Sequence, residues 1–145
     1  EESEAALRKE LELAPQGRAT LSLALLALGR GEEALEEAVR EQDEPFRLWA
    51  LAVIHHALGH PPESEAALED LVEKYAGDSA FQIAEIRAAR GEVNPAFEWL
   101  ERAYAQRDPG LGALKISRRL RPLHDDPRWG VLLRKLGLAG TGASE

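Results

Sequence analysis

The chain has 145 residues and a formal net charge of −8, with 44% apolar and 30% charged residues. This length suits one ordinary domain or one short solenoid, and the apolar fraction suffices for a continuous core. The absence of cysteine excludes a disulfide framework, a thiolate metal site and a cysteine nucleophile. The longest apolar runs fall short of the roughly 18 residues that a membrane span requires. The absence of methionine predicts a processed protein or part of a longer one.

The spacing of apolar residues predicts helices throughout. Residues 1–14 have one apolar stripe and are expected to form half of a helical hairpin. Three complete hairpins are predicted next, over 18–42, 45–75 and 79–107, each ended by a Gly, Pro or Asp signal. Segment 109–138 changes periodicity and is expected to cap the last hairpin, because the last repeat of an array has no neighbour. Residues 139–145 are expected to be a flexible tail.

The hairpins share a pattern around a central glycine. Gly29, Gly59 and Gly91 lie 30 and then 32 residues apart. A small residue follows each glycine by five positions, as Ala34, Ser64 and Ala96. A glycine ends a helix by taking a positive φ, and a small residue lets the next helix cross closely. Self-similarity at this period is typical of an α-solenoid.

The clearest helix is predicted over Asn94 to Tyr104, N-P-A-F-E-W-L-E-R-A-Y. Asn94 is expected to be its N-cap and Pro95 its first helical residue. As the second helix of the last hairpin, it is expected to pack Trp99 and Tyr104 against segment 109–138. Asp126 and Pro127 repeat the same cap-then-proline signature and predict a final helix that stops at Gly137.

The whole pattern resembles tetratricopeptide repeats. The match is closest in the last part, from F-Q-I-A-E-I-R-A-A-R-G-E-V-N-P-A-F-E-W-L-E-R-A-Y-A-Q-R-D-P-G-L to R-P-L-H-D-D-P-R-W-G-V-L-L-R-K-L-G-L. This part resembles the closing segment of bacterial regulators whose N-terminal part is often a winged-helix protein, a nucleotide cyclase or a kinase. The resemblance covers residues 1–138 and implies one all-α domain, a right-handed α-solenoid of TPR-like helical hairpins with a C-terminal helical cap.

The resemblance also implies a binding groove, because the first helix of each hairpin lines a concave surface in such repeats. The groove-facing residues would be Leu23, Leu26 and Ala27 in the first hairpin, Phe46, Trp49, Val53 and His56 in the second, and Asp78, Phe81, Glu85 and Ala88 in the third. This set is apolar and lacks a Lys/Arg/Asn clamp for a terminal carboxylate, which favours an apolar helix or segment as ligand. Burial of the aromatic residues between repeats is an equally weighted alternative.

The function implied is a protein–protein interaction scaffold or sensor module of a larger bacterial protein. A homo-oligomerisation module and a sensor for a small apolar ligand are the alternatives. We expect no enzyme activity, because no nucleophile motif or phosphate loop is present, and no cofactor. His55, His56 and His60 are expected to be packed or solvated rather than to bind a metal. The expected partner is a protein or peptide, not a nucleic acid or a membrane. The expected compartment is the cytoplasm, or the periplasm if the parent protein is membrane-anchored.

Charge is segregated along the chain. Between Lys115 and Lys135 there are seven basic and two acidic residues, so this segment is +5 and the rest is −13. The favoured interpretation is that Arg118, Arg119 and Arg121 lie over the acidic second helix of a nearby hairpin of the same chain, or are solvated. Self-association of this basic segment with the acidic hairpins of a second copy is the alternative, and it would weaken with added salt.

Overall fold

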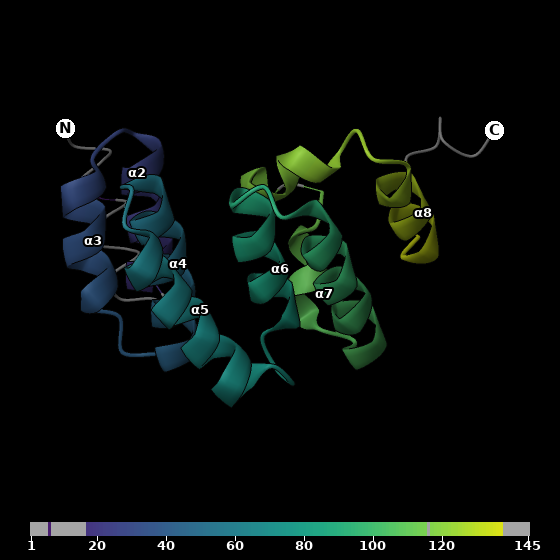
Figure 1. The fold of residues 1–145 in the computed structure, drawn as a ribbon, viewed down its shortest axis with the longest axis horizontal. Coiled ribbons are helices and arrows are strands. Elements are labelled where there is room, and N and C mark those ends of the chain that lie inside the picture. Colours follow the sequence, from purple (N-terminus) through teal and green to yellow (C-terminus); the bar gives the residue numbers. More distant parts are fainter. Residues whose placement is uncertain (1–5, 7–16, 116, 138–145) are drawn as a thin grey trace. The chain divides into compact units, whose positions relative to one another are not determined.

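The computed structural model describes Ala6, residues 17–115 and residues 117–137 (Figure 1). All regular structure within these ranges is helical, which confirms the predicted all-α class. The chain divides into two compact units, Glu1–Ala76 (unit 1) and Gly77–Glu145 (unit 2). The predicted half repeat over 1–14, apart from Ala6, and the tail over 139–145 lie outside the described residues. The single domain over 1–138 and its right-handed solenoid remain predictions.

Unit 1 contains α2 (Gly17–Ala27), α3 (Gly31–Val39), α4 (Glu44–Ala57) and α5 (Pro61–Tyr75). Helix α2 packs on α3 and α4, α3 also contacts α4, and α4 packs along α5 (Figure 1). Leu25, Ile54, Leu68 and Leu71 are fully buried in this unit. The first helices of the two pairs, α2 and α4, therefore contact one another, and their other neighbours are the second helices.

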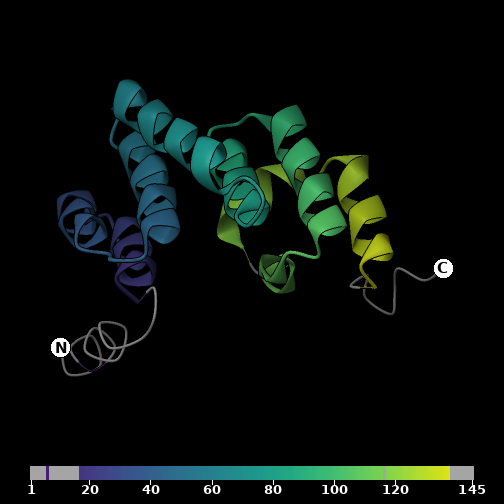
Figure 2. The ribbon, with the colours of Figure 1, turned by 90° about the horizontal axis from the view of Figure 1, so that it is seen from below.

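Unit 2 contains α6 (Ala80–Ala89), α7 (Val93–Gln106), the 3-10 helices η1 (Pro109–Ala113) and η2 (Arg118–Leu123), and α8 (Pro127–Lys135). Helix α6 contacts α7, η1 and η2 and is buried on nearly every side, which explains its almost continuous apolar sequence. Figure 2 shows α8, in yellow, beside α7. Within the described residues, η1 and η2 contact α6, and Arg128 and Lys135 of α8 contact Asn94 and Glu101 of α7. That segment 109–138 caps a repeat array remains a prediction.

The turn between the helices of each pair has the predicted geometry. Gly29, Gly59 and Gly91 have φ angles of +81°, +81° and +78°. In each turn the N–H after the glycine donates to the carbonyl five residues earlier, as from His60 to His55 at 2.8 Å. These bonds satisfy carbonyls that the helix end leaves open. The positive φ explains why glycine occupies this position.

The small residues of the pattern are buried in all three helix pairs. Ala34, Ser64 and Ala96 are at most 1% exposed. The Ser64 hydroxyl donates to the Ala52 carbonyl of α4 at 2.8 Å, so its polar atom is satisfied inside the contact. A larger side chain at these positions would force the two helix backbones apart.

One helix start differs from the prediction. Asp126 caps α8 as expected, because its side chain accepts the Arg128 N–H at 2.9 Å. Helix α7, however, begins at Val93 with Glu92 as its N-cap residue, so Asn94 lies inside the first turn. The Asn94 side chain instead accepts a hydrogen bond from the Arg128 guanidinium at 2.9 Å. Asn94 Oδ1, the oxygen predicted to cap α7, thus accepts a hydrogen bond from Arg128, 34 residues later in the sequence.

Candidate functional site

The predicted groove residues of unit 1 divide into covered and open ones. Leu23, Trp49 and Val53 are 6–8% exposed, whereas Leu26 and Phe46 are half-buried and His56 is exposed. The Phe46 ring meets the Trp49 ring edge to face, with 5.6 Å between centroids. On α4, the half-buried Phe46 ring therefore packs against the buried Trp49 ring.

The predicted groove residues of unit 2 are mostly covered. Phe81 and Glu85 are each 2% exposed, and Ala88 is fully buried. A Cβ atom added at Gly110 would lie 2.8–2.9 Å from Phe81 side-chain atoms, so the η1 backbone packs directly on that ring. Neither Phe81 nor Glu85 offers a surface to a partner, because segment 109–123 folds over them. Asp78 is exposed.

Glu85 is a buried carboxylate with partners from the covering segment. The Ser117 hydroxyl donates to Glu85 Oε2 at 2.5 Å, and Arg119 Nε lies 3.5 Å from the same oxygen. Burial of a carboxylate requires such partners, because desolvation disfavours the charged form. The predicted groove acid is therefore a packing element that holds η2 against α6. Arg119 thus pairs within the chain, but with α6, the first helix of its pair, and not with the second helix that the sequence analysis named.

A carboxylate closes two of the three helix pairs, and we call these residues, Glu41 and Asp108, the closing carboxylates. Glu41 follows α3 and accepts the Ala19 N–H of α2 at 2.8 Å and the Asp43 N–H at 3.0 Å. Asp108 follows α7 and accepts the Phe81 N–H of α6 at 3.1 Å and the Gly110 N–H at 2.8 Å. Each lies two residues after the second helix and binds an open N–H in the first turn of the first helix. Both are under 9% exposed, which shields these bonds from water.

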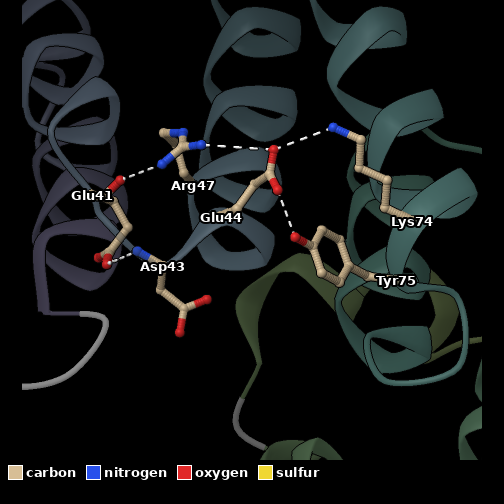
Figure 3. Close-up of polar contacts among 6 residues, drawn as sticks. All are labelled: Glu41, Asp43, Glu44, Arg47, Lys74 and Tyr75. Carbon is tan, nitrogen blue, oxygen red and sulfur yellow. Dashed lines mark hydrogen bonds and ion pairs between the residues drawn. The ribbon is translucent and has the colours of Figure 1, made fainter.

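The pair α4–α5 is closed differently, through Glu44 (Figure 3). The Tyr75 hydroxyl at the end of α5 donates to Glu44 Oε1 at 2.5 Å, and Lys74 Nζ lies 3.4 Å from Oε2. Arg47 contacts the same carboxylate at 3.8 Å and donates to the Glu41 carbonyl at 2.8 Å. Arg47 therefore connects the backbone of Glu41, which closes the pair α2–α3, with Glu44, which closes the pair α4–α5.

The pKa shifts of Glu44 and Tyr75 favour the hydrogen bond between them at neutral pH. The hydrogen bond from Tyr75 is the main reason that the pKa of the Glu44 carboxyl falls below its ordinary 4.5. The same bond raises the pKa of Tyr75 above its ordinary 10.0. Glu44 is consequently ionised and Tyr75 protonated at neutral pH, the states in which the bond forms. A tyrosine with a raised pKa is a poor general base, so this arrangement suits closure of the helix pair.

The Tyr75→Phe variant is expected to lower the melting temperature between about pH 5 and pH 9. The lowered pKa of Glu44 contributes stability above pH 4.5, and this contribution is lost as pH falls through its folded pKa. The raised pKa of Tyr75 contributes stability below pH 10, and this stability is lost as pH rises through the folded pKa of Tyr75. Thermal unfolding followed by circular dichroism should therefore show the largest difference from wild type near neutrality.

The matched control for this variant is Tyr104→Phe, which removes a hydroxyl from a half-exposed ring. Its melting curve should follow wild type across the same pH range. A Tyr75→Phe difference that is constant from about pH 3 to pH 11 would contradict the assignment, because a packing loss does not titrate.

Two of the three clustered histidines form a pair. His56 and His60 have helical spacing, but the structure couples His55 with His60 at 3.0 Å between their Nδ1 atoms. The pKa of His55 is lowered, first by burial and then by His60. One proton between the two nitrogens satisfies both. No group of three or more potential metal-ligating side chains occurs in the part of the chain that the structure describes.

Cations lie over the aromatic rings of α7. Arg102 lies 4.1 Å from the Trp99 ring centroid, and Lys135 of α8 lies 4.4 Å from that of Tyr104. Lys135 also pairs with Glu101 at 2.6 Å. The expected contact of Tyr104 with segment 109–138 is thus observed, through Lys135. At the start of α8, hydrogen bonds from Arg128 lower the pKa of Asp126 to about 2.

No described helix is long and apolar enough to cross a membrane. Comparison of the chain with protein-family models, with curated proteins and with solved structures gave no match.

Proposed function

We propose that the chain is a module of TPR-like hairpins, arranged as a right-handed α-solenoid, that binds an apolar helix or segment of a partner protein. Support comes from three helix pairs with the same glycine turn, a small buried residue five positions after that glycine and a closing polar contact between their ends. The three pairs share the glycine turn and the small buried residue, as expected for stacked units, although the pair α4–α5 is closed by other residues. The module would serve as the scaffold or sensor part of a larger bacterial protein.

We place the proposed binding face on α2 and α4 of unit 1. The observation that carries this proposal is Phe46, which is half-open while its ring rests edge to face on the buried Trp49. A partly open aromatic side chain held by a buried neighbour is the kind of rigid anchor that dominates binding energies. Leu26 on α2 adds a second half-buried apolar side chain. The corresponding face of unit 2 is covered by segment 109–123, so binding is proposed for unit 1 alone.

The proposal favours binding over catalysis because the carboxylates that stand out in the described residues already have structural partners. Glu41 and Asp108 bind backbone N–H groups, Glu85 binds Ser117, and Glu44 binds Tyr75. Each accepts a hydrogen bond from a donor of the same chain. A general acid or base needs an open position toward a substrate.

The test is a peptide selected for binding from a displayed library of amphipathic helices, with its affinity measured by calorimetry. Phe46→Glu is expected to weaken binding by at least about tenfold, because it places a charge at the apolar contact. Val39→Glu on α3, where the side chain is 57% exposed, is the matched control and should leave affinity unchanged. Circular dichroism must show native helicity in both variants.

Equal affinity of the Phe46→Glu and wild-type proteins for every selected peptide would overturn the proposed face. A stable symmetric dimer that excludes all peptides would favour the homo-oligomerisation module. Selection of small apolar compounds, but of no peptide, would favour a ligand sensor.

A further inference from the structure

Unit 2 carries a set of exposed cations with no ion-pair partner in the described residues. Lys115, Arg118 and Arg121 flank or belong to η2, and all three are exposed. We call them the basic strip. Neighbouring cations differ, because Arg119 pairs with Glu85, Arg128 with Asp126, and Lys135 with Glu101. The basic strip therefore comprises the cations on or beside η2 that have no ion pair within the described residues.

Unit 1 carries the opposite arrangement on α5. Glu69, Asp70 and Glu73 are exposed, and their i, i+1, i+4 spacing puts them on one side of the helix. We call them the acidic stripe. They too have no ion-pair partner within the described ranges, and the adjacent Lys74 binds Glu44. The acidic stripe lies in the C-terminal half of α5, where the helix dipole disfavours negative charge.

The two units differ strongly in net charge. Unit 1 has seventeen acidic and seven basic residues, a net charge of −10. Unit 2 has nine acidic and eleven basic residues, a net charge of +2. Each copy of the chain therefore carries a negative unit and a weakly positive unit, and units of opposite charge attract one another between copies.

We propose that copies of this chain associate head to tail, with the basic strip of one copy on the acidic stripe of the next. Such a contact joins two different surfaces, so it can continue into chains or close into rings. This inference concerns other residues than the proposed peptide-binding face and stands independently of it.

A second copy fits the basic strip better than a nucleic acid does. The chain is −8 overall, which repels a polyanion. Residues 107–123 contain no aromatic residue, so the strip offers no stacking platform for bases. The acidic stripe of another copy supplies three carboxylates for three cations. Because exposed ion pairs are individually weak and screened by salt, the association is expected to be weak and salt-dependent.

The experiment measures mass by sedimentation velocity on the full chain at low and high salt. The wild-type protein is expected to self-associate at about 20 mM salt. Its affinity for a second copy is expected to fall at least about tenfold at about 300 mM salt. Reversal of the acidic stripe (E69K/D70K/E73K) or of the basic strip (K115E/R118E/R121E) should each abolish association. The control E32K/E36K reverses two exposed charges on α3 and should retain it.

The decisive sample is a mixture of the two reversal variants. One variant then has two positive surfaces and the other two negative ones, so neither self-associates but the mixture should. This outcome cannot come from misfolding, because a misfolded variant would not regain association. A wild-type chain that stays monomeric at low salt would overturn the proposal. So would a mixture that stays monomeric, or a nucleic acid that binds the basic strip more tightly than a second copy does.

Discussion

The Phe81→Ala variant is expected to lower the free energy of unfolding of unit 2 by about 4 kcal/mol. Phe81 is 2% exposed, and its ring lies directly under the Gly110 backbone. Truncation would remove its buried contacts and leave a cavity that the two helices beside it cannot fill. Urea denaturation followed by circular dichroism gives the value, and Trp99 and Trp129 report on this unit by fluorescence.

Phe46→Ala is the matched comparison, because the same residue type is half-buried at that position. Its expected cost is only about 1 kcal/mol, in proportion to the smaller apolar area withdrawn from water. Equal losses in the two variants would contradict the division into a covered aromatic residue in unit 2 and an open one in unit 1. A Phe81→Ala protein with wild-type stability would show that Phe81 belongs to a surface.

The Asp108→Ala variant is expected to destabilise unit 2 by about 3 kcal/mol. The side chain is 8% exposed and accepts the backbone N–H groups of Phe81 and Gly110. Its removal would leave a buried donor at the start of α6 without an acceptor, where Ser79 provides no side-chain cap. Asp108→Asn keeps one acceptor oxygen and should recover part of the loss.

Glu98→Ala is the control for this variant, because Glu98 is an exposed acid on α7 of the same unit. It is expected to change stability by less than about 0.5 kcal/mol. Urea denaturation of all three proteins separates the role of the closing carboxylate from a general effect of charge. A loss of less than about 1 kcal/mol in Asp108→Ala would rule out closure of the helix pair by this carboxylate.

The features that the sequence predicted are those with local causes. Gly29, Gly59 and Gly91 could be identified because a glycine after an apolar helical run ends the helix by itself. Asp126 could be identified as a cap because the N–H that it binds lies two residues away. The all-helical class follows from apolar spacing and composition, which act within a few residues.

The features that the sequence could not predict depend on distant contacts. Glu41 and Asp108 look like ordinary loop acids, because the N–H groups that they bind lie 22 and 27 residues earlier. The covering of Phe81 depends on where segment 109–123 folds, which helical spacing does not specify. A weak signal did exist for the closing carboxylates, since each is an acid two residues beyond the end of a second helix.

The histidine pair shows how a turn can override helical spacing. His56 and His60 are four residues apart, but Gly59 ends the helix between them, so a shared helix face is not expected. The glycine turn instead folds His60 back onto the helix end, where its N–H donates to the His55 carbonyl. The two side chains then meet at 3.0 Å.

The most direct test of the proposed binding face is nuclear magnetic resonance of the 15N-labelled chain, titrated with a selected apolar helical peptide. We predict that the largest shift changes occur in α2 and α4, at Leu26, Phe46 and the Trp49 indole. Signals of α7 and α8 should remain in place. Changes confined to the outer sides of α3 and α5, or to unit 2, would contradict the account.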